Sequence, residues 1–236
     1  MSISVVIPAY KEAENLEELL PKLNAVLLQI KQPYEILVID TMSRKDNTEE
    51  ICQKNKCAYV NRENGNGYGD AIRTGIRKAS NKYLVVMDAD GSHNSGDIVK
   101  FYEAIEKGYD LIIGSRYIVG GNSHNGLILK LMSYILNITY RMFFNIKAKD
   151  ISNSFRMYRA EQLKSLVLEC NNFDIVEEII IKLSVSILQF KLLEVPIFFD
   201  QRKHGESKRD LKKFIFSYIA TIRRLLQFKV NGGNSD

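Results

Sequence analysis

Cysteine, histidine and tryptophan are scarce in this sequence of 236 residues, which has three cysteines, three histidines and no tryptophan. Cys52, Cys57 and Cys170 lack metal-type spacing, and no two histidines are spaced as in a zinc site, so we expect no zinc centre. Residues 1–6 lead directly into a predicted strand, without the basic region of a signal peptide. These features predict a cytoplasmic protein with free thiols.

Long apolar runs are also missing. The longest, residues 127–146, is interrupted by Lys130 and Arg141, and only residues 131–140 are free of charge. A helix that spans a bilayer needs roughly 18–20 apolar residues. We therefore expect contact with a membrane surface at most, and no crossing.

Acidic residues are few near the C-terminus. Residues 202–229 contain nine Lys or Arg and two acidic residues, so this segment alone carries more positive charge than the whole chain, whose formal net charge is +5. Such a segment favours the phosphates of nucleotides or lipids. Nucleic acid is not an expected partner, because the charge is confined to one segment and no nucleic-acid-binding motif appears.

Apolar strands and amphipathic helices alternate through the first half of the chain. Strands are predicted at residues 3–7, 34–39, 58–60, 83–87 and 110–114, with helices at 11–29, 48–55, 69–79 and 97–107. Pro21 predicts a kink or a break in the first helix. This pattern predicts an α/β fold with a mainly parallel sheet flanked by helices. Ligands in such sheets bind beyond the carboxyl ends of the strands.

The second half is predicted to be mostly helical. Apolar helices are expected at residues 127–146 and 174–190, and a late strand at 192–199 contains Pro196, which is typical of an edge. A basic amphipathic helix is predicted from residue 210 to residue 230. We divide the chain into a domain at 1–209 and a C-terminal helix with a polar tail at 210–236. That helix either lies on a membrane or packs against the domain or a second subunit.

Two carboxylates follow the fourth predicted strand. Asp88 and Asp90 are two residues apart, so they would point the same way if the strand continued. A hard divalent cation with oxygen ligands would relieve their repulsion and could bridge to a substrate phosphate. The alternative is a solvated loop at a strand end. Asp40 ends the second strand, where it could bind a nucleotide or simply form a turn.

Other motifs are weaker when taken alone. Gly67 lies in ENGNGYG, which does not match a dinucleotide fingerprint and is better explained by unusual backbone angles or close approach. Arg116 follows a strand and could neutralise a phosphate, or could be a surface residue. His93 is either structural or a ligand or base. Glu177 and Glu178 suit a helix N-terminus, and a general-base role for them would need a hydroxyl acceptor.

Five motifs, taken in order, resemble those of family 2 glycosyltransferases with the GT-A fold. The branch that they resemble most contains the dolichol-phosphate mannosyltransferases and related polyprenyl-phosphate sugar transferases. The motifs are VVIPAYKE at 5–12, DADGSH at 88–93, IGSRY at 113–117 with the following Gly120 and Gly121, DISNSFRMY at 150–158, and VPI at 195–197 with Arg202, Gly205, Ser207 and Lys208. The tryptophan-containing motif of processive polysaccharide synthases is absent.

The resemblance implies a role for each matched residue. Pro8, Tyr10, Glu12 and Asp40 would contact the base and ribose of the nucleotide, and Asp88 and Asp90 would address the ribose and the metal. Gly67, in its loop before a helix, is a further predicted nucleotide contact. Asp88, Asp90 and Ser92 would hold Mg²⁺ or Mn²⁺. Arg116, Arg202 and Lys208 would bind the donor and acceptor phosphates during catalysis, together with Asp90. The sequence departs from the family after Asp40, where a second aspartate is missing, and before Ser133, where Leu129 and Lys130 replace an expected arginine.

The predicted reaction is metal-dependent transfer of a sugar from a nucleotide-diphospho-sugar, GDP-mannose or a UDP-hexose, to a polyprenyl phosphate. A phosphate acceptor is already mostly ionised at pH 7 and needs cations rather than a base. This fits a sequence rich in candidate cations, and the transfer is expected to be inverting. The main alternative is a hydroxyl acceptor in cell-surface polysaccharide synthesis. The expected location is the cytoplasmic face of a membrane, and a homodimer is an open alternative to a monomer.

Overall fold

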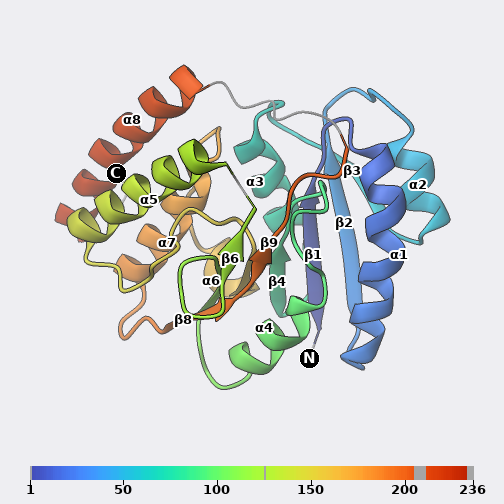
Figure 1. The fold of residues 1–236 in the computed structure, drawn as a ribbon, viewed down its shortest axis with the longest axis horizontal. Coiled ribbons are helices and arrows are strands. Elements are labelled where there is room, and N and C mark those ends of the chain that lie inside the picture. Colours follow the sequence, from blue (N-terminus) through green and yellow to red (C-terminus); the bar gives the residue numbers. More distant parts are fainter. Residues whose placement is uncertain (1, 125, 205–210, 233–236) are drawn as a thin grey trace.

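A seven-stranded sheet forms the centre of the protein (Figure 1). The computed structural model describes residues 2–124, 126–204 and 211–232, and for residues 211–216 it describes the backbone alone. The strand order is β3-β2-β1-β4-β7-β5-β8. All neighbouring pairs are parallel except the two that involve β7. The strands are β1 (Ile3–Pro8), β2 (Tyr34–Asp40), β3 (Ala58–Asn61), β4 (Tyr83–Val86), β5 (Leu111–Ser115), β7 (Arg156–Arg159) and β8 (Leu192–Pro196). The predicted α/β class and mainly parallel sheet are confirmed.

The antiparallel strand β7 is one of the elements that the sequence pattern did not predict, together with the short β6 (Asn122–Ser123) and α6 (Ala160–Lys164). Its sequence is RMYR, which does not read as a buried strand, yet Arg156 is fully buried. Its guanidinium donates hydrogen bonds to the backbone carbonyls of Asn153, Val176 and Ile151. Because these carbonyls satisfy the buried donors, a charged residue can occupy a central strand. β8 lies at the edge of the sheet, as Pro196 predicted.

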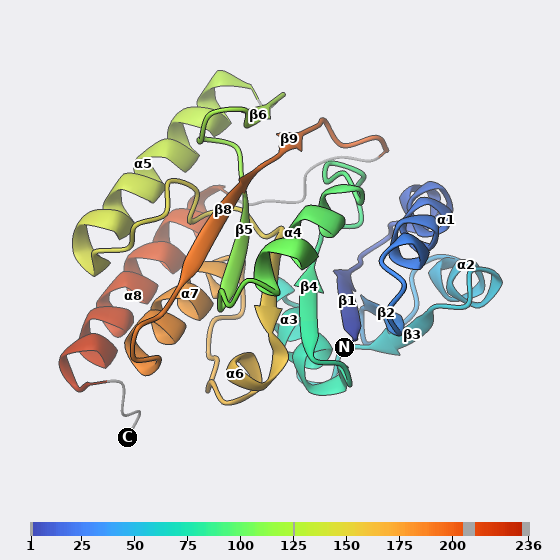
Figure 2. The ribbon, with the colours of Figure 1, turned by 90° about the horizontal axis from the view of Figure 1, so that it is seen from below.

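Helices cover both faces of the sheet (Figures 1 and 2). The helices α1 (Ala13–Gln29), α2 (Thr48–Lys54) and α4 (Asp97–Ile105) pack on one face. On the other face lie α3 (Tyr68–Lys78), α5 (Leu127–Phe144), α6 (Ala160–Lys164), α7 (Ile175–Ser186) and α8 (Leu211–Val230). A separate two-stranded sheet pairs β6 (Asn122–Ser123) with β9 (Phe198–Phe199). No break occurs at Pro21, which is exposed inside a continuous α1, so water can satisfy the carbonyl that the proline leaves unpaired.

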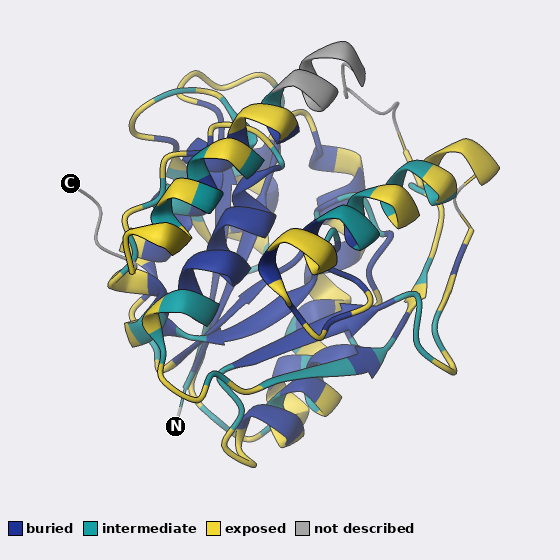
Figure 3. Cartoon of the chain, turned by 90° about the vertical axis from the view of Figure 1, so that its left-hand side faces the viewer, coloured by how far each residue is buried: buried dark blue, intermediate teal, exposed yellow. Residues whose placement is uncertain are grey.

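Helix α5 presents an apolar surface to solvent. Among the described residues it is the one helix long and apolar enough to cross a bilayer by length and composition, with a mean hydropathy of 1.2, and 17% of it is buried. Asn137, Tyr140 and Phe144 form its buried side. Figure 3, in which the side of the molecule that carries α5 and α8 faces the viewer, shows long stretches of these helices in the exposed or intermediate colour. The exposed apolar residues of α5 are Leu127, Ile128, Leu129, Leu131, Tyr134, Ile135, Met142 and Phe143.

The described side chains of α8 pack against the domain. Tyr218, Thr221 and Leu225 recur at helical spacing and are buried. Ser217 and Thr221 each donate a hydrogen bond of 2.6 Å to Asp174, which precedes α7. Arg224 lies 3.6 Å from Glu169 and 3.8 Å from Glu178. This half of the C-terminal helix is therefore joined to the domain by both apolar and polar contacts.

The two acids at the start of α7 are fully buried. Glu178 accepts the backbone N–H groups of Glu169 and Cys170 and pairs with Lys182 at 2.9 Å. The oxygens of Glu177 accept no hydrogen bond of ordinary geometry from the described residues. Burial, only partly offset by Arg156, raises the pKa of Glu177 to about 8. Neither carboxylate is at a surface that a substrate could reach.

We expect Leu225→Ala to lower the free energy of unfolding by about 2–5 kcal/mol, because it removes a fully buried side chain between α8 and the domain. The matched control is Ile219→Ala in the same helix, where the side chain is 52% exposed, and this change should cost no more than about 0.5 kcal/mol. Urea denaturation of both variants measures the difference. Equal losses would mean that α8 does not dock through its buried side.

Glu177 should make stability fall as the pH rises. Its folded pKa of about 8 exceeds the ordinary value of 4.5, so its contribution is fully present below the lower value and is lost as the pH rises through the higher one. Between pH 5 and pH 9, wild type should lose stability relative to Glu177→Gln by at most about 1.4 kcal/mol per pH unit. Denaturation at several pH values measures this trend, and parallel curves for the two proteins would contradict it.

Candidate functional site

A cavity of about 390 Å³ lies beyond the carboxyl ends of β1 and β4. It brings together six residues that the sequence singled out, although they come from three distant parts of the chain. The complete lining is Pro8, Ala9, Tyr10, Glu12, Arg62, Asn66, Tyr68, Asp88, Ala89, Asp90, Phe173 and Arg202. Parallel strands place their carboxyl ends at the same edge, which explains the convergence.

A second cavity, of about 180 Å³, shares Asp88, Asp90, Phe173 and Arg202 with the first. Its polar wall contains an arginine and four hydroxyl groups, from Ser92, Arg116, Ser133, Ser152 and Ser154. Its apolar wall comes largely from α5 and α8, through Leu129, Met132, Leu136 and Tyr218. Asp88 and Asp90 thus line both the larger and the smaller cavity, and the smaller cavity has one polar and one apolar side.

Asp88 is held by two hydroxyl groups. The Ser154 hydroxyl donates to Oδ2 at 3.0 Å, and the Tyr68 hydroxyl donates to Oδ1 at 3.3 Å. The ring of Tyr68 stacks on Phe173 with 4.3 Å between the ring centroids. These contacts fix the carboxylate from α3 on one side and from the segment before β7 on the other.

Asp90 is stabilised as a carboxylate. Its Oδ1 accepts the backbone N–H of Ser92 at 3.1 Å and the Ser92 hydroxyl at 2.6 Å, while Oδ2 lies 3.2 Å from Arg202 Nη2. Burial acts to raise the pKa of Asp90, but the Ser92 hydrogen bonds and the nearby Arg202 outweigh it, so the pKa lies below its ordinary value. Asp90 is therefore ionised at neutral pH.

Arg202 connects the C-terminal part of the chain to the first loop. Its Nη1 donates to Glu12 at 2.9 Å while Nη2 pairs with Asp90. The Lys203 backbone N–H donates to the Asp90 carbonyl, and the Asp200 N–H to the Ser92 carbonyl. The segment at 200–203 is thus attached along the loop that carries both carboxylates.

Asp88 and Asp90 are the candidate oxygen donors for a divalent cation. No cluster of three or more His, Cys, Asp or Glu side chains suited to a metal exists in the part of the chain that the structure describes. Asp88 and Asp90 nevertheless line both cavities. One or two carboxylates combined with substrate phosphates and water are a usual arrangement for Mg²⁺. The residues present fit a cation that is bound together with a diphosphate, whereas the Ser92 hydroxyl is directed at Asp90.

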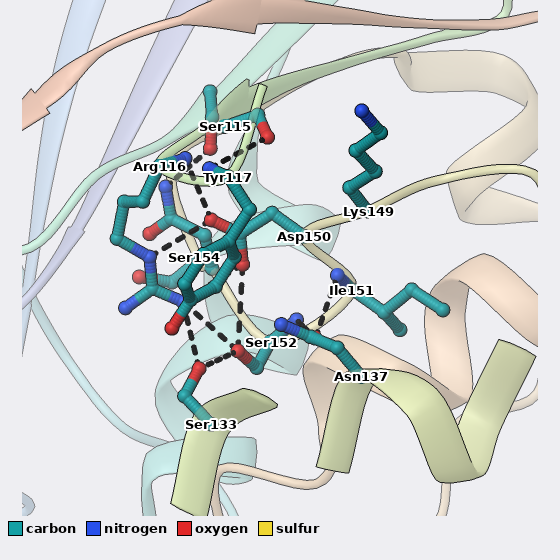
Figure 4. A network of polar contacts seen from close by, with 12 residues as sticks. Ser115, Arg116, Tyr117, Ser133, Asn137, Lys149, Asp150, Ile151, Ser152 and Ser154 are labelled. Atoms are coloured by element: carbon teal, nitrogen blue, oxygen red, sulfur yellow. Dashed lines mark hydrogen bonds and ion pairs between the residues drawn. The ribbon is translucent and has the colours of Figure 1, made fainter. Parts of the chain in front are cut away.

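Arg116 is locked in a buried network at the second cavity (Figure 4). Its Nε and Nη2 form a two-pronged pair with Asp150 at 2.8 and 2.7 Å, and Nη2 also donates to Ser133 and Ser152. Burial alone would lower its pKa, but Asp150 reverses the effect and the pKa is raised. Within the described part of the chain, none of its hydrogen bonds or ion pairs uses Nη1. These contacts hold the Arg116 guanidinium and the hydroxyls of Ser133 and Ser152 in fixed positions on one wall of the second cavity.

Two predicted nucleotide contacts lie outside the lining of the first cavity. Asp40 is fully buried, and it accepts the Thr41 N–H at 2.8 Å and the Tyr59 hydroxyl at 3.2 Å. Burial raises its pKa. Gly67 is the N-cap residue before α3, and a Cβ there would lie 2.4 Å from the Asn171 carbonyl oxygen, so close backbone approach requires glycine. Lys208 lies outside the described residues.

Three residues of the first cavity were missed by the sequence analysis: Arg62, Tyr68 and Phe173. Arg62 is 6% exposed and donates to the carbonyls of Ala9, Asn66 and Gly67, so it joins two loops that wall the cavity. Burial lowers its pKa. The sequence could have indicated Arg62, because this residue directly follows β3 at the carboxyl end of a strand. Tyr68 lies inside ENGNGYG, where only a glycine was singled out, and Phe173 belongs to none of the quoted motifs. Their stacking contact reveals both residues.

The sequence profile of "Glycosyl transferase family 2" matches residues 4–167. Dolichol-phosphate mannosyltransferase of Pyrococcus furiosus is 37% identical over 97% of this chain, which spans 65% of the length of that relative. Polyprenol monophosphomannose synthase of Mycolicibacterium smegmatis is 30% identical over 86% of this chain and 79% of its own.

Solved structures of glucosyl-3-phosphoglycerate synthase from Mycobacterium tuberculosis are similar in fold. The complex with Mn²⁺, UDP and glucosyl-3-phosphoglycerate has a TM-score of 0.72 and 18% identity, and the match covers 96% of this chain and 80% of that one. Another of these structures contains Mg²⁺ and UDP. The expected GT-A fold is confirmed, and the matched profile, the two relatives and this fold identify the chain as a member of glycosyltransferase family 2.

Proposed function

We propose that this enzyme transfers a sugar from a nucleotide-diphospho-sugar to a polyprenyl phosphate. The observation that carries the proposal is the second cavity, where a buried arginine and serine hydroxyls face an apolar wall next to Asp88 and Asp90. Such a cavity suits a phosphate joined to a hydrocarbon chain. The names of the two relatives, which refer to dolichol phosphate and to polyprenol monophosphomannose, support the same acceptor class.

The larger cavity is assigned to the donor. Pro8, Tyr10 and Glu12 line the part formed by the first loop, where they can contact the nucleotide. Asp88 and Asp90 would hold Mg²⁺ or Mn²⁺, as the ions in the similar structures suggest. When bound, such an ion would stabilise the negative charge that develops on the leaving diphosphate. Arg202 borders both cavities, so it can contribute to the same stabilisation from the protein side.

The acceptor needs no base in this mechanism. A phosphate monoester has a second pKa of about 6 and is mostly ionised at neutral pH. The only carboxylates that line the second cavity among the described residues are Asp88 and Asp90, while Glu177 is fully buried away from it. Arg116 and the neighbouring hydroxyls can orient the phosphate, and attack from the side opposite the diphosphate gives inversion. The predicted phosphate role of Lys208 is retained as part of the proposal.

We further assign the membrane-facing side to α5. Its exposed apolar residues continue from Leu129, which lines the second cavity, to the outer surface of the helix. Helices of this kind insert their apolar side at the lipid interface. A lipid acceptor could then reach the cavity without leaving the bilayer. The chain would be peripheral at the cytoplasmic face, and a homodimer stays a prediction.

The reaction is tested by incubating the protein with Mg²⁺ or Mn²⁺, dolichyl or undecaprenyl phosphate, and labelled GDP-mannose or UDP-hexoses in turn. Label should enter the organic phase with one donor. Asp90→Asn should reduce the rate at least about a hundredfold, because it removes charge beside the diphosphate while keeping the side-chain shape. EDTA should abolish transfer.

Asp200→Asn is the matched control, since this acid is 57% exposed in the neighbouring segment and should leave the rate nearly unchanged. Donor-specific hydrolysis without lipid labelling would refute the phosphate acceptor and favour a hydroxyl. Full activity in Asp90→Asn would refute the catalytic assignment.

Membrane contact through α5 is tested by replacing Leu127, Ile128 and Leu131 with glutamine. Sedimentation with vesicles that contain anionic lipid should show about tenfold weaker binding, because three exposed apolar side chains no longer enter the interface. The control replaces Val167 and Leu188, which are 61% and 94% exposed outside α5. Equal losses in the two proteins would show that α5 is not the docking surface.

A further inference from the structure

The loop that carries both carboxylates is closed on itself by a histidine. The backbone N–H of Asp88 donates to His93 Nδ1 at 3.1 Å, so the first and last residues of DADGSH are joined. Gly91 has φ +78°, which allows the chain to turn inside this loop. Asp90 is held within it by Ser92. Both carboxylates therefore belong to one closed loop of six residues.

The direction of each hydrogen bond follows from the backbone groups at the two ends. Asn153 Nδ2 donates to the Gly114 carbonyl, which can only accept, so the amide oxygen of Asn153 faces His93. His93 Nε2 lies 3.3 Å from that oxygen and must carry the proton. The Asp88 N–H can only donate, so Nδ1 must accept. A single neutral tautomer of His93, with its proton on Nε2, satisfies every hydrogen bond in the series from Asp88 through His93 and Asn153 to Gly114 in β5.

Packing fixes the imidazole ring in the same orientation. His93 is 2% exposed, stacks on Phe155 with 4.7 Å between centroids, and meets the edge of Phe199 at 5.3 Å. Asn153 is also 2% exposed. His93 lines neither of the two cavities that contain Asp88 and Asp90. His93 lines a separate cavity of about 280 Å³ that contains neither carboxylate. Because both of its nitrogens are used in hydrogen bonds, it has none left for a cation or nucleotide bound at Asp88 and Asp90.

We propose that His93 is a positioning residue, which closes the 88–93 loop through Nδ1 and so holds Asp88 and Asp90 at the separation needed to bind a cation with a nucleoside diphosphate. Two like charges this close repel each other, and a loop without the closing hydrogen bond would let them move apart. Groups that orient metal-binding side chains commonly affect affinity by about 10–100-fold when they are removed. The inference rests on the proposed donor site, but not on the identity of the acceptor.

Three variants separate hydrogen bonding from packing. His93→Phe keeps an aromatic ring on Phe155 but removes both nitrogens. His93→Asn loses the ring, yet its Oδ1 occupies nearly the place of Nδ1 and can accept the Asp88 N–H. His93→Gln places its polar group nearer to the position of Nε2. Calorimetry with Mn²⁺ plus GDP, and with Mn²⁺ plus UDP, measures the Kd for each protein at a temperature where denaturation curves show it folded.

The Kd of the nucleotide that wild type binds should rise about 10–100-fold in His93→Phe and His93→Gln, and stay within about threefold in His93→Asn. Thermal stability should instead depend on whether the aromatic ring is retained, so His93→Asn should be less stable than His93→Phe. The donor KM should rise in parallel with the Kd. Unchanged affinity in His93→Phe, or equal losses in His93→Phe and His93→Asn, would overturn the proposal.

A spectroscopic measurement tests the closure independently of binding. Long-range ¹H–¹⁵N spectra of wild type at pH 7.5, compared with His93→Asn for assignment, should show His93 as the Nε2–H tautomer. A proton on Nδ1 would overturn the proposal. If wild type bound neither GDP nor UDP, the proposed donor site would fail, and the tautomer would still decide whether His93 closes the loop.

Discussion

Two carboxylates at the end of a buried strand impose the main electrostatic constraint on this protein. Asp88 and Asp90 follow β4, whose residues are fully buried between helical layers. Charges in such a place must be paired or hydrogen-bonded to stay ionised. The structure supplies hydroxyls from Tyr68, Ser154 and Ser92, and a cation from Arg202. The remaining features of the site are arranged around these contacts.

Distant segments meet at the carboxylates because each supplies one of the required partners. Arg202 lies far along the chain from Glu12, yet it pairs with both Glu12 and Asp90, so the first loop and the late segment are joined at the larger cavity, which is proposed to bind the donor. Phe173 precedes α7 and stacks on Tyr68, and Asp174 beside it accepts two hydroxyls from α8. The C-terminal helix is consequently linked to the cavity wall, and packing against the domain was one of the placements that the sequence left open.

Buried cations have different roles on the two sides of the site. Arg156 uses its donors on backbone carbonyls and supports the antiparallel strand β7. Arg116 is neutralised by Asp150 but still lines the second cavity, where serines share its Nη2. Arg156 therefore has its hydrogen-bond donors directed at the backbone and not at a ligand, whereas Arg116 keeps an oriented guanidinium at the wall of the second cavity. Sequence alone does not separate these cases, because both arginines lie in short motifs, IGSRY and DISNSFRMY, that do not reveal their hydrogen-bond partners.

The sequence by itself determined the order of strands and helices in the first half of the chain, the convergence of Pro8, Asp88 and Asp90, and the family, because apolar periodicity and short motifs are local properties. It could not predict β7, since RMYR becomes a strand only when distant carbonyls satisfy Arg156. It also could not place Asp40, whose carboxylate is enclosed by Tyr59 and Thr41 instead of lining the donor cavity. Nor could it find Tyr68 and Phe173, or separate a ligand role for His93 from a positioning one. Those outcomes were decided by tertiary structure, because burial and hydrogen-bond partners come from residues far apart in the chain.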